Sequence, residues 1–187
     1  ADSLHYSYVR VDIDREKRTA TVCVSAPVGK LLTTLAEIQA AGDSWYPLQM
    51  ARELDDAILS LRTNELDIGT WLLRTVGDAK LALESDAVLM KHQDHWLVKE
   101  TTGLLRRTLA RLDVSSRSMF ALIDEGSCFA GTLAELAFAA DRAYMLSLPD
   151  APENAPHIAL SDMNFGVFPM VRSEERRVGR EGAEPCR

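Results

Sequence analysis

The stretch that decides the fold is FALIDEGSCFAGTLAELAFAAD, residues 120–141. It begins inside an apolar run over 118–123, crosses a loop of small residues with Gly126 and Gly131, and ends in an alanine- and leucine-rich segment. A short apolar run bounded by loop residues is typical of a buried strand, and the segment after the loop predicts a helix over 132–140. We therefore expect a strand, a glycine-containing loop and a helix in succession.

Such a unit suits the stabilisation of an anion. Free backbone N–H groups at the beginning of a helix, aligned with its dipole, favour a developing negative charge such as the enolate oxygen of a thioester. Gly131 would let the backbone approach a ligand closely. The residues alone leave open the alternative that both glycines only turn the chain and that the helix belongs to the core.

The flanking residues predict alternating strands and helices. Alternating apolar residues and short apolar runs predict strands at 4–13 and 19–24, which form an opening hairpin, and at 68–75, 143–148 and 157–160. Apolar residues spaced by three and four predict helices at 31–41, 47–61 and 94–112. This order predicts an α/β fold with right-handed crossovers.

Composition excludes several classes of protein. The 187 residues are 47% hydrophobic and 26% charged, as expected of one globular domain, and no apolar run approaches a membrane span. A formal charge of -7 disfavours nucleic-acid binding. The three cysteines lack C-x-x-C spacing and no secretory signal is seen, so we expect a cytoplasmic protein.

Residues 120–141 resemble the signature of the crotonase (enoyl-CoA hydratase/isomerase) family, in which Glu-Leu-Ala follows a glycine-rich loop. Glu135 and Asp141 keep the family's spacing. Residues 160–169, LSDMNFGVFP, are similar to the family's Pro-Glu-x-x-x-Gly-x-x-Pro and place Asp162 at the second catalytic carboxylate. Gly77 falls where the first oxyanion N–H donor is expected. The resemblance implies a crotonase-like (ββα)n spiral, incomplete at both ends, that handles acyl-CoA substrates.

The sequence departs from the family pattern at the residues that carry chemistry. The family's triple glycine is here Gly131-Thr132-Leu133, so Thr132 stands at the second oxyanion position and its side chain could crowd an acyl-CoA. The second carboxylate is the shorter Asp162. Glu135 and Asp162 are therefore either an acid/base pair or vestiges of one.

A double-length subgroup of the family is more similar still. Matching segments include WYPL at 45–48, LLRRTLARLDVSSRS at 104–118 and GSCFAG at 126–131. This resemblance implies that residues 1–171 are the second, divergent half of a longer enzyme that opens the ring of a ring-bearing CoA thioester. Coenzyme A would enter only as part of the substrate, without a metal or redox cofactor. The implied partners are an N-terminal crotonase half of the same chain and a second copy in a homodimer. The alternatives are a generic enoyl-CoA hydratase/isomerase, or a non-catalytic scaffold and dimerisation half.

Other candidate groups favour structural roles. His92 and His95 lie three residues apart without a third ligand nearby, so we assign no metal. Cys128 could be a nucleophile near a helix N-terminus, but a buried small thiol is the commoner case. Ser127 lacks the Gly-x-Ser-x-Gly spacing of a nucleophile elbow.

The last residues break the pattern. From Arg172 the sequence RSEERRVG resembles the in-frame translation of a common sequencing adaptor. Val178, Ala183 and Cys186 are its only apolar residues through position 187, so it offers no face for a helix to bury. We interpret 172–187 as a non-native tail; the alternative is a solvated charged segment.

Overall fold

A six-stranded sheet forms the centre of the molecule. The computed structural model describes residues 2–149, 151 and 155–168. The strands of the sheet are β1 (Ser3–His5), β2 (Val9–Asp14), β3 (Thr19–Ser25), β4 (Thr70–Val76), β5 (Ser118–Ile123) and β7 (Arg142–Met145), in the order β1-β2-β3-β4-β5-β7. The first three strands pair antiparallel, and the pairs from β3 to β7 are parallel. Two short strands, β6 (Phe129–Ala130) and β8 (Ile158–Ala159), pair in a second, parallel sheet.

The helices lie between the strands along the chain. They are α1 (Leu35–Ala41), α2 (Tyr46–Asn64), α3 (Ala79–Lys91), α4 (Trp96–Asp113) and α5 (Ala134–Ala139). In the part of the chain that the structure describes, none of these helices combines the length and the apolar character that crossing a membrane requires.

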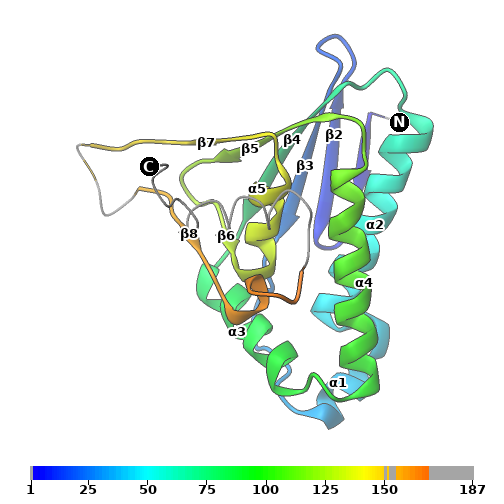
Figure 1. The fold of residues 1–187 in the computed structure, drawn as a ribbon, viewed down its shortest axis with the longest axis vertical. Coiled ribbons are helices and arrows are strands. Elements are labelled where there is room, and N and C mark those ends of the chain that lie inside the picture. Colours follow the sequence, from blue (N-terminus) through cyan, green and yellow to red (C-terminus); the bar gives the residue numbers. More distant parts are fainter. Residues whose placement is uncertain (1, 150, 152–154, 169–187) are drawn as a thin grey trace, which may run out of the picture.

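Helices cover one face of the sheet. Helices α2 and α4 pack side by side, and α5 lies against β5 and β7 (Figure 1). Alternate strand residues point to this face and are buried, among them Val22, Trp71 and Ala121. Their neighbours Leu72, Phe120 and Leu122 are only half-buried on the other face. The sheet thus has its core on the helical side.

The predicted α/β class, the opening hairpin and the strand at 118–123 are confirmed. The helix predicted over 31–41 begins only at Leu35, because the Thr34 hydroxyl caps it in a reciprocal pair with Glu37. Helix α3 lies where no element was expected. The Asp78 side chain caps it by accepting a hydrogen bond from the Lys80 backbone N–H. The predicted tail, 172–187, lies outside the described residues.

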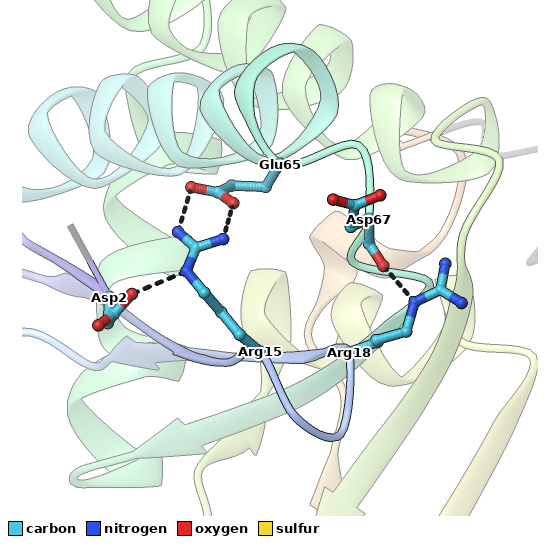
Figure 2. Close-up of polar contacts among 5 residues, drawn as sticks. All are labelled: Asp2, Arg15, Arg18, Glu65 and Asp67. Atoms are coloured by element: carbon cyan, nitrogen blue, oxygen red, sulfur yellow. Dashed lines mark hydrogen bonds and ion pairs between the residues drawn. The ribbon is translucent and has the colours of Figure 1, made fainter.

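A pair of arginines fastens the turn between β2 and β3 to the segment before β4 (Figure 2). Arg15 donates two hydrogen bonds to the Glu65 carboxylate, at 2.8 and 3.0 Å, and one to Asp2 at 2.9 Å. Arg18 donates to the Asp67 carbonyl at 2.8 Å. Hydrogen bonding to Arg15 lowers the pKa of Glu65. The arrangement fixes where the first parallel strand pair begins.

Candidate functional site

The loop after β5 leads into a shorter helix than the sequence suggests. A 3-10 turn over Gly131–Leu133 precedes α5, which holds only residues Ala134–Ala139. Ala140 is extended, with φ -66° and ψ 146°, and this ends the helix. The prediction of a helix over 132–140 is therefore wrong in its bounds. A helix this short aligns few peptide dipoles, so any anion binding here rests on individual hydrogen-bond donors.

The hydrogen-bond donors at this position already bind the carboxylate of Asp86, which lies in α3. The Thr132 backbone N–H donates to Asp86 Oδ2 at 2.7 Å, and the Thr132 hydroxyl donates to Oδ1 at 2.6 Å. The Ser161 hydroxyl donates to Oδ2 at 2.5 Å. Burial raises the pKa of Asp86, and these hydrogen bonds oppose that shift. Sequence reasoning did not identify Asp86.

Gly131 is required by the same contact. Its φ of +53° is a left-handed conformation that side chains rarely adopt, and a Cβ there would overlap the Asp86 carboxylate. The glycine therefore lets α3 approach the loop. The roles of Gly131 and Thr132 in an oxyanion site stay predictions, but the Thr132 N–H is hydrogen-bonded to Asp86.

Glu135 lies inside the core. Its side chain is fully buried, and the Asn164 amide donates to its Oε1 at 2.8 Å and to the Gly131 carbonyl at 2.9 Å. Asn164 is fully buried as well, and its Oδ1 accepts from the Ser161 backbone N–H at 2.9 Å. Asn164 thus joins the loop, α5 and the 3-10 turn at 162–164.

Asp162 does not share the buried position of Glu135. It is exposed at the start of the 3-10 turn Asp162–Asn164 and lines an open hollow of about 570 Å³. Asp86 also borders this hollow, whereas Glu135 is absent from its lining. The structure therefore does not bring the two predicted carboxylates to one hollow. Their catalytic roles stay predictions.

Gly77 follows β4 directly and is exposed. Its φ is +119°, and a Cβ there would lie 2.8 Å from the Ala26 Cβ. Glycine is therefore needed for the chain to turn from β4 into α3 beside Ala26. Its expected role as an oxyanion donor stays a prediction.

On the side of Asp86 that faces Thr132 and Leu133, the free space is small. The cavity between α2, α3 and the loop measures about 10 Å³. One water molecule needs about 10–15 Å³, and a cavity known to bind benzene measures about 150 Å³. Its walls include Tyr46, Met50, Leu89 and Leu133. This cavity is therefore too small for an acyl group.

The other candidate groups have structural partners. The His92 ring contacts the Thr33 carbonyl at 2.9 Å, and the His95 ring contacts the Gln39 amide at 3.2 Å. Within the described ranges, no three His, Cys, Asp or Glu side chains are grouped so as to hold a metal ion. Ser127 accepts a hydrogen bond from the Asp124 backbone N–H, which closes the loop.

The Cys128 thiol is expected to resist alkylation in the folded chain. It is 1% exposed, and burial, with a smaller contribution from Asp78, raises its pKa to about 11. At pH 7.5 only about one thiol in several thousand is then ionised, and the thiolate is the nucleophile. Peptide mapping by mass spectrometry should show iodoacetamide labelling of Cys128 at least ~100-fold slower in native protein than in urea. Equal rates would revive the nucleophile interpretation.

Comparison with known proteins gives one extensive match. The chain is 59% identical over 172 residues to benzoyl-CoA-dihydrodiol lyase of Aromatoleum evansii, which covers 92% of this chain and 30% of that protein. The chain thus spans less than a third of the relative's length. No family model matches. This match confirms the similarity to a longer enzyme that residues 45–48, 104–118 and 126–131 indicated.

Comparison with solved structures shows the fold through one match. An enoyl-CoA hydratase from Geobacillus kaustophilus superimposes with a TM-score of 0.57 over 96% of this chain and 60% of that chain, at 15% identity. An enoyl-CoA hydratase from Bacillus halodurans gives a TM-score of 0.46 over 73% of this chain and 49% of that chain, also at 15% identity. The first match shows that the chain has the crotonase fold, as predicted from residues 120–141.

Proposed function

We propose that this chain is a region of a benzoyl-CoA-dihydrodiol lyase, an enzyme that opens the oxidised, non-aromatic ring of a benzoyl-CoA derivative in aerobic benzoate degradation. The observation that carries the proposal is the 59% identity over 92% of the chain. The bond cleaved would be a carbon–carbon bond of the ring, and coenzyme A would take part only as a portion of the substrate. The proposal includes no metal and no redox cofactor.

We further propose that this region is a scaffold within the longer enzyme and that the chemistry takes place in another part of it. The small volume of the cavity beside Thr132, about 10 Å³, and the hydrogen bond from the Thr132 N–H to Asp86 support this division. The complete burial of Glu135, which accepts a hydrogen bond from Asn164, also supports the scaffold role. The partners in this proposal are the rest of the same chain, the acyl-CoA substrate bound there, and a second copy in a homodimer.

An activity comparison tests the reaction class. The longer protein that contains this region should turn over the dihydrodiol or epoxide of benzoyl-CoA faster than crotonyl-CoA, and dialysis against a chelator should leave the rate unchanged. Faster turnover of crotonyl-CoA would replace the proposal with a generic enoyl-CoA hydratase.

The scaffold role predicts that Glu135→Gln changes kcat of the longer enzyme by no more than a few fold. Proton transfer by a positioned carboxylate contributes about 10²- to 10⁴-fold to the rate. If Glu135 were catalytic, its replacement would therefore lower kcat by about that factor. The matched control is Glu125→Gln, an exposed glutamate in the loop between β5 and β6. A fall in kcat of about a hundredfold at an unchanged melting temperature would show that Glu135 is catalytic.

A further inference from the structure

The contacts of Asp86 have the form of a filled anion site. The backbone N–H and hydroxyl of Thr132 and the hydroxyl of Ser161 all donate to one carboxylate, at 2.5 to 2.7 Å. An ionised carboxylate only accepts hydrogen bonds, so it matches one N–H and two hydroxyls that can all donate to it. Thr132 lies in the 3-10 turn before α5 and Ser161 directly before the 3-10 turn at 162–164, whereas Asp86 lies in α3.

Because both partners are buried, the hydrogen bonds between Asp86 and its donors matter for stability. Asp86 is 3% exposed and Thr132 is 7% exposed. A buried carboxylate is costly unless its oxygens accept hydrogen bonds, and buried donors are costly unless an acceptor reaches them. Each side of the contact therefore stabilises the other, and removing the carboxylate would leave a cluster of donors around a small void.

We propose that Asp86 is the built-in occupant of an anion site whose donors are Thr132 and Ser161, and that removing its carboxylate creates a binding site for a small external carboxylate. In the intact chain the Asp86 carboxylate accepts hydrogen bonds from all of these donors, so no external anion can accept them. This inference deepens the proposed function, and rests on it for the role of the loop. The binding site itself rests on the hydrogen bonds alone.

The group that the substitution deletes determines which anion is tested. Asp86→Ala deletes one carboxylate group and keeps the Cβ, so formate, a single carboxylate on a hydrogen atom, is the anion that refills the space. Formate should raise the melting temperature of Asp86→Ala along a saturating curve. The expected rise is ~3–6 °C at a concentration ten times its Kd, with little change in the unsubstituted chain.

Matched controls separate site binding from a general salt effect. Glu84→Ala removes an exposed carboxylate from the same helix and should show no saturating response. Asp86→Asn fills the void with an amide and should not respond either. Formamide, which has the shape of formate without its charge, should leave Asp86→Ala unchanged.

The result that overturns the proposal is a formate response of Asp86→Ala no larger than that of Glu84→Ala. If Asp86→Ala does not fold in buffer, it is refolded in formate and in formamide. More folded protein in formate supports the proposal, and equal recovery contradicts it. Because the readout is thermal stability, failure of the ring-opening assay would leave this test unaffected.

Discussion

Replacing Gly131 with alanine is expected to destabilise the chain far more than the same replacement at Gly126. Both glycines have positive φ, +53° and +76°, so both variants carry a backbone cost of about 1–2 kcal/mol. At Gly126 a Cβ meets nothing within 4 Å. At Gly131 it overlaps the Asp86 carboxylate, whose displacement from its hydrogen bonds adds about 3 kcal/mol or more.

Urea unfolding of the two variants measures the difference. A double-mutant cycle shows whether Asp86 is the cause. In the Asp86→Ala background, the cost of Gly131→Ala should fall most of the way to that of Gly126→Ala, because the Ser161 hydroxyl, 3.3 Å from the new Cβ, is then the nearest neighbour. Equal destabilisation by the two glycine variants in the unsubstituted chain would show that the loop can move away from α3 at little cost.

Asn164→Ala is expected to cost about 3–5 kcal/mol of unfolding free energy. The substitution removes hydrogen bonds of 2.8 Å to Glu135, 2.9 Å to the Gly131 carbonyl and 2.9 Å from the Ser161 N–H. All of these bonds lie inside the core or at its edge, where water cannot replace the lost donor cheaply. The buried Glu135 carboxylate would lose the donor that the amide supplies.

The control for this variant is the next residue, Phe165, which is 64% exposed. Phe165→Ala should change stability by less than about 1 kcal/mol, as expected of a substitution at the surface. Chemical denaturation followed by circular dichroism gives both values. A cost for Asn164→Ala as small as that for Phe165→Ala would mean that Glu135 is held by other contacts.

The sheet could be predicted because its buried strands are short apolar runs with clear boundaries. The strand at 118–123 matches β5 at both ends, and the long helices have regular apolar spacing. Helix α3 was missed because Ser85 and Asp86 interrupt its apolar face, although both are buried. Polar residues in the middle of a buried face weaken the periodic pattern that predicts a helix.

The polar residues Ser85 and Asp86, buried within the apolar face of α3, are the signal that could have identified the hydrogen-bonded site at Asp86. Asp86 lies 46 positions before Thr132, so no local motif connects them. Thr132 was expected to crowd a bound acyl group, but in the structure its hydroxyl donates to Asp86. The spacing of Glu135 and Asp162 could be recognised along the chain. Whether Glu135 is buried and Asp162 exposed depends on tertiary packing, and the spacing of residues along the chain does not determine it.

The arginine contacts at the turn between β2 and β3 bear on the order in which the sheet assembles. Strands β2 and β3 can pair on the microsecond timescale of a hairpin, but β3 must find β4 about fifty positions later, and such distant parallel pairing is slow. Arg15 and Arg18 bind Glu65 and Asp67, just before the first paired residue of β4. Once these contacts form, β4 lies close to β3, and little of the chain remains to be ordered before the two strands pair. The contacts then set the register of the first parallel pair at the residues where both strands begin.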